Sequence, residues 1–190
     1  MKRQRDAWWH RIAGLDLGRF VFLDESGAKT NMTRRYGRTF GGQRVVDAAP
    51  HGHWHTTTML ASIRLDGTTA AMVIEGATDA AVFGAYVNHV LVPSLRPGDV
   101  VVMDNLAPHK VTGVAEAIAS VGATAWYLPP YSPDFNPIEK MWSKIKAFLR
   151  KVKARTPEAL LNAIATALRT VSASDAAGWF KSCGYRYDSS

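Results

Sequence analysis

Apolar residues change their spacing partway along the chain, and this change predicts a first half made of strands. The run "RFVFLDES" is continuously apolar before its acids and predicts a buried strand at about 20–25. β-Branched residues are frequent in "HWHTTTMLASIRL", so a second strand is expected at about 53–65. The turn sequence "DGT" then leads back into a third strand at about 69–75.

The second half of the chain alternates helices with strands. Apolar residues in "TDAAVFGAYVNHVLVPSL" recur at helical spacing, and Thr78 is the expected N-cap of that helix. A strand buried on both faces is predicted at about 99–104, followed by a short helix and a last strand in "ATAWYLPPYS". A long helix is expected to begin near Pro137, and another at Pro157 with Thr156 as its N-cap.

This order predicts an α/β protein with a mixed five-stranded sheet flanked by helices. The hairpin makes the first strands antiparallel, and the strand–helix–strand units make the later strands parallel through right-handed crossovers. In such sheets, ligands bind beyond the carboxyl ends of adjacent strands. We divide the chain into a basic linker arm at 1–19, a core at 20–155 and a C-terminal helical extension at 156–190.

The charge of the chain indicates a class of partner. Among 190 residues the net charge is +7, and the basic residues are clustered. Clustered positive charge favours a phosphate-backbone partner, and a merely basic surface is the alternative. The candidate DNA-binding residues are Arg34, Arg35, Arg38, Lys140, Lys144, Lys146 and Arg150.

Cysteine content and hydropathy indicate a cytoplasmic protein. Cys183 is the only cysteine, so no disulfide can form within the chain. No apolar run reaches the length of a membrane span, and no membrane partner is expected. The N-terminal residues are basic but contain no apolar stretch of the kind found in signal peptides.

Three acidic residues stand at element ends, where a sheet of this kind binds ligands. Asp24 ends the first predicted strand, Asp104 ends the fourth, and Glu139 heads the helix after the fifth. Carboxylates that converge from separate elements suit Mg²⁺ or Mn²⁺, and two such ions can clamp an in-line displacement at phosphorus. Each acid also has a structural alternative. Asp104 equally fits a turn cap, Glu25 lies beside Asp24, and Glu139 fits the N3 position of a capping box.

Three blocks around these acids resemble a known family. "FLDES", "VVMDNLAPHK" and "PPYSPDFNPIEKMWSKIK" look like the catalytic blocks of DDE transposases, in the bacterial insertion-sequence branch of the Tc/mariner superfamily. The 34 residues between Asp104 and Glu139 match the second interval of that superfamily, and the resemblance covers about 20–155. It implies an RNase H-like fold of the retroviral-integrase type. It also implies a catalytic triad of Asp24, Asp104 and Glu139 with two Mg²⁺ ions, for which Mn²⁺ can substitute.

The resemblance further implies an activity and partners. The activity is hydrolytic cleavage at transposon ends, followed by attack of a 3′-hydroxyl on target DNA. The active form is a homodimer in the synaptic complex. The protein is expected to be bacterial and associated with the nucleoid when it is bound to DNA. Such transposases begin with helix-turn-helix modules, which do not fit into the arm at 1–19, so an upstream half joined by fusion or frameshifting is expected. Two other functions stay open, a non-catalytic DNA-binding or regulatory fragment and an RNase H-like nuclease.

Several polar residues near these blocks have supporting roles in this interpretation. Asn105 is expected to support the geometry around the acid before it, and His109 to contact a phosphate or cap the next helix. Asn136 and Pro137 fit the N-cap and N1 positions of the helix that carries the third acid. Alternating histidines have a spacing that suits zinc, although no further ligand cluster is evident. They are His51, His53 and His55.

Overall fold

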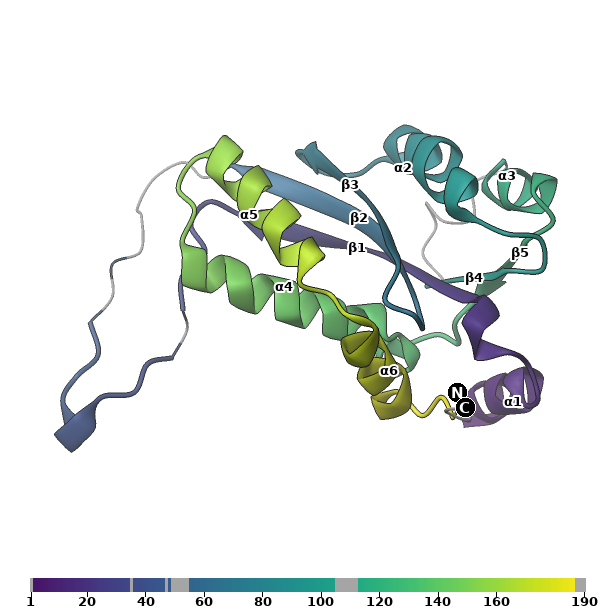
Figure 1. The fold of residues 1–190 in the computed structure, drawn as a ribbon, viewed down its shortest axis with the longest axis horizontal. Helices are drawn as coiled ribbons and strands as arrows, with labels where there is room; N and C mark the ends of the chain where they lie inside the picture. Colours follow the sequence, from purple (N-terminus) through teal and green to yellow (C-terminus); the bar gives the residue numbers. More distant parts are fainter. Residues whose placement is uncertain (1, 35, 47, 49–54, 105–112, 187–190) are drawn as a thin grey trace.

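A five-stranded mixed sheet lies at the centre of the protein in the computed structural model, which describes residues 2–34, 36–46, 48, 55–104 and 113–186 (Figure 1). The strands run in the order β3-β2-β1-β4-β5. β1 pairs antiparallel with β2, and β2 with β3, whereas β1, β4 and β5 are parallel. The predicted mixed sheet is therefore confirmed. The strands are β1 (Phe20–Lys29), β2 (Thr56–Arg64), β3 (Thr69–Glu75), β4 (Val100–Met103) and β5 (Thr124–Tyr127).

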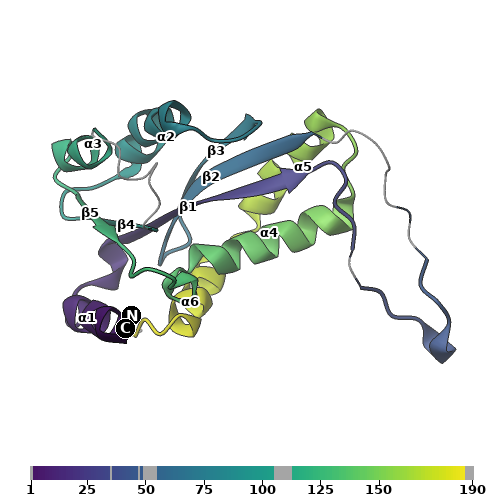
Figure 2. The same ribbon diagram turned by 180° about the vertical axis from the view of Figure 1, so that it is seen from behind.

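Helices cover both faces of the sheet, as the two opposite views show (Figures 1 and 2). Helices α4, α5 and α6 lie on one face, α2 and α3 lie on the other, and α1 lies beside the C-terminal segment. Among the described residues, no helix has the length and apolar character needed to cross a membrane. The helices are α1 (Lys2–Ile12), α2 (Ala80–Tyr86), α3 (Val114–Ser120), α4 (Ile138–Val152), α5 (Pro157–Arg169) and α6 (Ala173–Ser182).

The central strand β1 is apolar on both faces because a helical layer covers each of them. Phe20 and Phe22 belong to the core under α4, α5 and α6, whereas Val21 and Leu23 belong to the core under α2 and α3. All of these side chains are fully buried, and each such burial stabilises the fold by about 1.5–3 kcal/mol. The alternation also determines the face to which each later residue of β1 points.

Some element ends differ from their predicted positions. β1 continues to Lys29, beyond its expected end, because its pairing with β2 continues that far. Thr78 is not the N-cap of α2. That role belongs to Asp79, which has extended backbone angles (φ −112°, ψ −178°) and accepts a hydrogen bond at Oδ1 from the Val82 N–H at 2.8 Å.

The first 19 residues do not form a simple linker arm, because they contain a helix that packs on the core. α1 buries Trp8 and Ile12, which are 3% and 8% exposed. The ring of Trp8 meets that of Trp126 edge-on at 6.1 Å, and the guanidinium of Arg11 lies 3.4 Å over the Trp126 ring. Trp8 and Ile12 are one helical turn apart, but the basic residues around them hide this amphipathic signal.

The C-terminal extension belongs to the same core as β1 and α4. Thr156 caps α5 as predicted, since its Oγ1 accepts a hydrogen bond from the Ala159 N–H at 3.2 Å. α6 begins after Ser172, whose Oγ accepts a hydrogen bond from the Asp175 N–H at 3.1 Å. Its Phe180 ring packs edge-on against the Phe22 ring of β1, with centroids 5.2 Å apart. The extension therefore covers, together with α4, the face of the sheet that carries Phe22.

A buried ion pair ties the end of β2 to the start of β4. The side chains of Arg64 and Asp99 are 4% and 0% exposed, and Arg64 Nη2 donates to Asp99 Oδ2 and to Ser94 O. Burial raises the pKa of Asp99, but hydrogen bonds from Arg64 and from the Arg96 N–H outweigh this effect and hold the pKa below its ordinary value. Asp99 is therefore a carboxylate in the folded protein at neutral pH.

We predict that Asp99→Asn lowers the free energy of unfolding by about 3–5 kcal/mol at neutral pH, because Arg64 stays buried without its counter-ion. The pKa of Asp99 is lower in the folded state than in the unfolded state. Its contribution is therefore fully present above the unfolded value of about 3.9 and is lost as the pH falls through the folded value. Denaturant titrations should show a difference between parent and variant that narrows below about pH 4. A difference that does not change with pH would contradict this assignment.

Candidate active site

Asp24 and Asp104 stand level with each other at the point where β4 ends, although Asp24 lies within β1 and not at the strand end that the sequence predicts. The ladder between β1 and β4 pairs Phe22 with Val102, and each acid follows its strand residue by two positions. Residues two apart along a strand share a face, so both acids lie on the face of Phe22 and Val102. That face is the one that α4 covers, because both apolar side chains belong to the core there.

All three predicted acids line one cleft of about 400 Å³, with Glu139 contributed by the first turn of α4. Asp24 is 8% exposed, Asp104 is half-buried and Glu139 is exposed. The rest of the lining comes from the segment that joins β5 to α4. These residues are Leu128, Pro129, Pro130, Tyr131, Ser132, Pro133 and Asn136.

Asp24 is oriented by the helix that covers it. The Trp142 Nε1–H donates to Asp24 Oδ2 at 3.2 Å, and Trp142 is 2% exposed. Glu139 lies about one turn before Trp142, so α4 supplies one acid and orients another. Asp24 thus stands level with Asp104 on the neighbouring strand and is hydrogen-bonded to the helix that carries Glu139. Glu25 is assigned to the opposite face by the alternation of the strand, and it does not line the cleft.

The capping box that is the structural alternative for Glu139 is not formed. Asn136 has extended angles (φ −102°, ψ 102°) and Pro137 has helical angles (φ −60°, ψ −29°), as the N-cap and N1 positions require. The Asn136 N–H, however, donates to Pro133 O at 3.0 Å and closes the 3₁₀ turn η6 (Pro133–Phe135). No side-chain capping bond occurs at this helix start in the described residues. Capping therefore does not account for Glu139.

The side chain of Asn136 has an unmet hydrogen-bonding requirement. Asn136 is 3% exposed, and its Oδ1 is buried with no partner in the described part of the protein. Leaving such an oxygen without a hydrogen bond costs about 1–3 kcal/mol of stability. In native proteins, a water molecule, an ion or a ligand usually supplies the missing partner. Since Asn136 lines the cleft of the three acids, we expect its partner to come from the contents of that cleft.

The segment between β5 and α4 is tied to α1 and to the C-terminal segment. Arg5 Nη1 donates to Ser132 Oγ and to Asp134 Oδ1, both at 2.9 Å. The Arg5 guanidinium lies 3.9 Å over the Phe135 ring, and Phe135 O accepts a hydrogen bond from the Tyr185 O–H at 2.7 Å. Hydrogen bonds from Arg5 lower the pKa of Asp134. One wall of the cleft is therefore held from two distant parts of the chain.

The donor set of the cleft fits a hard divalent cation. Within the described residues, no three His, Cys, Asp or Glu side chains come close enough together to enclose one ion. Mg²⁺ does not need such a cage, since one or two carboxylates with waters and substrate phosphates usually hold it. Asp24, Asp104 and Glu139 can provide that arrangement. His55, one of the histidines considered for zinc, instead places Nδ1 2.9 Å from Glu75 Oε1.

Basic residues gather at the far end of α4 from the acids. Arg34 and Arg38, both predicted DNA-binding residues, line a groove of about 660 Å³ together with Lys151 and Lys153. The segment that carries the two arginines extends away from the sheet toward the 3₁₀ turn η2 (Phe40–Gly42) (Figure 1). The two lysines belong to the basic run after the third acid, but the sequence does not indicate that the loop meets them.

Four other predicted DNA-binding residues lie along α4, and one of them, Lys144, contacts α6. Lys140 is exposed, and Lys146 and Arg150 are half-buried. Lys144 Nζ donates to Asp175 Oδ2 at 2.6 Å, so we assign this residue to the contact between α4 and α6 and not to a DNA surface. Five predicted residues lie outside the described part of the chain. They are Arg35, His51, His53, Asn105 and His109.

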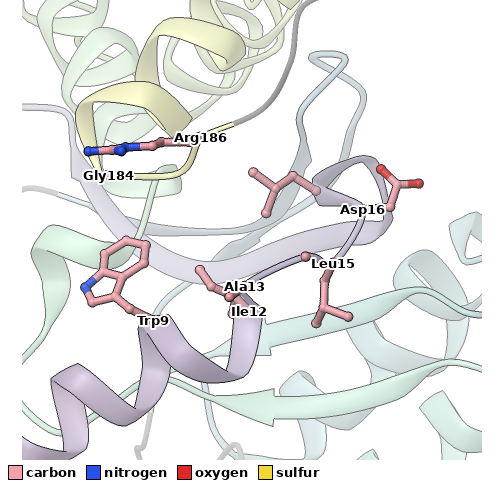
Figure 3. Close-up of a pocket in the computed structure, with 9 residues that line it drawn as sticks. Trp9, Ile12, Ala13, Leu15, Asp16, Gly184 and Arg186 are labelled. Carbon is pink, nitrogen blue, oxygen red and sulfur yellow. The ribbon is translucent and has the colours of Figure 1, made fainter.

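A larger cavity, of about 840 Å³, lies between α1 and the C-terminal segment (Figure 3). Trp9 and Arg186 approach it from opposite sides. Asp16 is the only acid among its lining residues, and Asp16 Oδ1 accepts a hydrogen bond from the Gly18 N–H at 2.8 Å. Because this cavity lacks a cluster of reactive groups, its size does not make it the better candidate.

Three residues that shape the cleft are not among the site residues that the sequence predicts. The apolar stripe of its helix predicts Trp142 as core, and nothing local shows that its N–H reaches an acid. Arg5 contacts a residue 127 positions away, which no local pattern reports. Tyr131 has a positive φ of 55°, and the prolines around it are the one local signal of an unusual backbone.

Residues 19–161 match the family model of the DDE superfamily endonucleases. No curated protein matches the chain. Its fold is similar to that of a Mos1 transposase paired-end complex with left transposon end, with a TM-score of 0.78 and 15% identity over 95% of this chain and 56% of that chain. A mariner Mos1 paired-end complex with Mg gives a TM-score of 0.69 and 18% identity, over 96% of this chain and 56% of that chain.

A more distant likeness extends to a chain of the simian T-cell lymphotropic virus intasome in complex with PP2A regulatory subunit B56 gamma. Its TM-score is 0.58 with 16% identity, over 83% of this chain and 49% of that chain. The RNase H-like fold of the retroviral-integrase type is thereby confirmed. This chain spans about half the length of the transposase chains that it resembles.

We predict that Trp142→Phe lowers the free energy of unfolding by about 1.5–3 kcal/mol, because Asp24 loses a buried hydrogen-bond donor while an aromatic ring is kept. Trp126→Phe is the matched control, since no hydrogen bond of its indole N–H occurs among the described residues, and its cost should be clearly smaller. Denaturant unfolding of both variants measures the difference. Equal losses would show that the hydrogen bond to Asp24 contributes nothing.

Proposed function

The chain belongs to the DDE superfamily endonucleases, and on this basis we propose that it is the catalytic part of a DDE transposase of the Tc/mariner type. It cuts phosphodiester bonds at transposon ends and joins the freed 3′ ends to target DNA. The observation that carries the proposal is the common cleft of Asp24, Asp104 and Glu139, which come from two strands and a helix that are far apart in sequence.

The three acids are proposed to hold two divalent cations, Mg²⁺ or Mn²⁺. When bound, such ions neutralise charge on the phosphate and make an attacking water or hydroxyl more acidic. Asp24 stands level with Asp104 and is hydrogen-bonded to the helix that carries Glu139, so it is proposed to contribute to both positions. Trp142 keeps the Asp24 carboxylate in its orientation. Asn136 Oδ1 accepts a hydrogen bond from a water molecule in the cleft, which meets its unmet requirement.

DNA is proposed to run along α4 from the acids to the basic groove. Twelve positions separate Glu139 from Lys151, which corresponds to about 18 Å of helix and about five base pairs of B-DNA. Lys146 and Arg150 lie on the same side of α4 as Glu139, because residues seven and eleven apart return to nearly the same helical angle. A phosphate held at the acids therefore has cations along the path of its strand.

Recognition of transposon ends is proposed to require a DNA-binding part that is not within these residues, joined by fusion or frameshifting. The chain spans 56% of the similar Mos1 transposase chain. Two copies are proposed to hold two transposon ends in one synaptic complex, since the similar Mos1 structure is a paired-end complex. The chain alone is expected to bind DNA through its phosphates and with little sequence preference.

We predict that Asp24→Asn, Asp104→Asn and Glu139→Gln each reduce DNA nicking in Mg²⁺ or Mn²⁺ by more than about 100-fold. Mutation of a residue that only supports a metal ligand already lowers metal affinity or activity by about 10- to 100-fold. The three acids are proposed as the ligands themselves, so their loss should cost more. Nicking of plasmid DNA measures the effect, and Ca²⁺ should support binding with little cleavage.

Matched controls separate the site from a general loss of charge. Glu25→Gln changes the acid beside Asp24 on the opposite face, and Glu158→Gln changes an acid in the first turn of α5, as Glu139 is in α4. Both should cut like the parent protein. Near-normal cleavage by Glu139→Gln would refute its assignment as a ligand. Nicking without any joining of 3′ ends to target DNA, in a protein that carries its DNA-binding part, would favour an RNase H-like nuclease.

We predict that Arg38→Ala and Lys151→Ala each weaken DNA binding and reduce the slope of log affinity against log salt by about 1. Lys144→Ala should leave that slope unchanged, because its ammonium contacts α6, and should lower the free energy of unfolding by about 1 kcal/mol or less. Fluorescence anisotropy over a range of salt concentrations measures both effects. A preference of about a thousandfold for one duplex sequence would contradict binding through phosphates alone.

A further inference from the structure

Tyr131 combines three features that folding alone does not explain. It lines the cleft of the three acids, it is 88% exposed, and its backbone is left-handed with φ 55°. Among the described residues, Lys153 is the only other non-glycine residue with a positive φ. This conformation is unfavourable for a residue with a Cβ atom, and glycine or asparagine adopts it more readily.

The residues on both sides of Tyr131 are held in place. Pro130 precedes it and has a fixed φ, and Pro133 follows two residues later and restricts the backbone of Ser132. Between them, Ser132 Oγ accepts a hydrogen bond from Arg5 Nη1 at 2.9 Å. A strained backbone persists only where its surroundings determine it in this way, and such residues cluster at functional sites.

The Tyr131 ring itself contributes little to the fold. No hydrogen bond or ring contact of its side chain occurs among the described residues, and most of its surface faces solvent. A large aromatic ring that is exposed at the rim of a cleft is suited to binding a flat ligand. In a cleft that is proposed to hold a DNA phosphate, the flat group that follows the phosphate is a nucleobase.

We propose that Tyr131 is a stacking platform for the nucleobase next to the phosphodiester held by the three acids, and thus a positioning residue for the reaction. This inference rests on the proposed function. Both faces of a base are covered within an intact duplex, so stacking on Tyr131 requires an unpaired or extruded base. The preferred substrate is therefore a DNA strand whose nucleotide at the point of cleavage is unpaired. Stacking tolerates any base, which agrees with a chain that reads little sequence by itself.

The test uses a duplex with a short single-stranded 3′ overhang that carries 2-aminopurine, in Ca²⁺ so that the DNA stays intact. Stacking on an aromatic ring quenches 2-aminopurine fluorescence. The fluorescence intensity of the probe should therefore be lower when it is bound to the parent protein than when it is bound to Tyr131→Gly. The affinity of Tyr131→Gly for this probe should be about 5- to 100-fold lower, as expected for the loss of one stacked base.

Other variants and a second probe separate the ring from the backbone. Glycine relieves the positive φ, so Tyr131→Gly should unfold at the same temperature as the parent or higher. Tyr131→Asn removes the ring but suits the same backbone, and should behave like Tyr131→Gly. Tyr131→Phe and Tyr131→Trp keep a platform and should keep the quenching. A blunt duplex offers no unpaired base, so Tyr131→Gly should bind it with nearly the parent affinity.

Equal fluorescence of the probe bound to the parent and to Tyr131→Gly would overturn the inference, and so would an equal loss of affinity for the blunt duplex. Either result would leave the proposed function intact, because nicking by the acid variants is measured separately. Failure of the parent protein to bind either probe would overturn the proposed function and this inference with it.

Discussion

The parallel pairing of β1 with β4 is the constraint on which the site depends. Its register places Phe22 opposite Val102, and two residues later Asp24 and Asp104 emerge level and on one face. A slip of one residue would turn one acid toward α2 and α3, because successive side chains alternate between faces. Buried apolar side chains on both faces of these strands oppose such a slip, as does the buried ion pair at the start of β4. The packing of the core and the position of the acids are thus set together.

Helix α4 carries the third acid, and its length sets the distance between this acid and the basic groove. Its apolar stripe packs on the face of β1 that carries Asp24, and Trp142 from that stripe donates to the carboxylate. A shift of α4 by one turn, about 5.4 Å, would break this bond and also remove Glu139 from the cleft. At its other end the same helix brings Lys151 to the groove. A single packed helix therefore sets the separation between groups suited to a metal ion and groups suited to phosphate.

Local patterns predict the sheet and its acids, whereas contacts between distant segments decide the rest. Periodicity and a turn signal predict a strand at 69–75, and β3 is Thr69–Glu75. Asp104 and Glu139 stand at element ends that the same patterns locate, whereas Asp24 lies within β1, which continues to Lys29. The failed capping box depends on the turn before Asn136, whose N–H is already bonded. The role of Lys144 depends on Asp175 in α6, and the packing of α1 depends on a pair of residues surrounded by basic ones. Nothing within a few residues of these positions reports such contacts.

The N-terminal helix holds one wall of the cleft, although none of its own residues lines the cleft. Arg5 of α1 bonds Ser132 and Asp134, and hydrogen bonds from Arg5 lower the pKa of the Asp134 carboxyl, so the tether stays charged from neutral pH into the mildly acidic range. The two residues that Arg5 contacts, Ser132 and Asp134, flank Pro133, and Ser132 directly follows Tyr131. The residues on both sides of Tyr131 are therefore held by α1 and by prolines, whereas its ring is 88% exposed and makes no hydrogen bond or ring contact among the described residues. A side chain that is positioned without being used in packing is available to a ligand, and here it stands at the rim of the three-acid cleft.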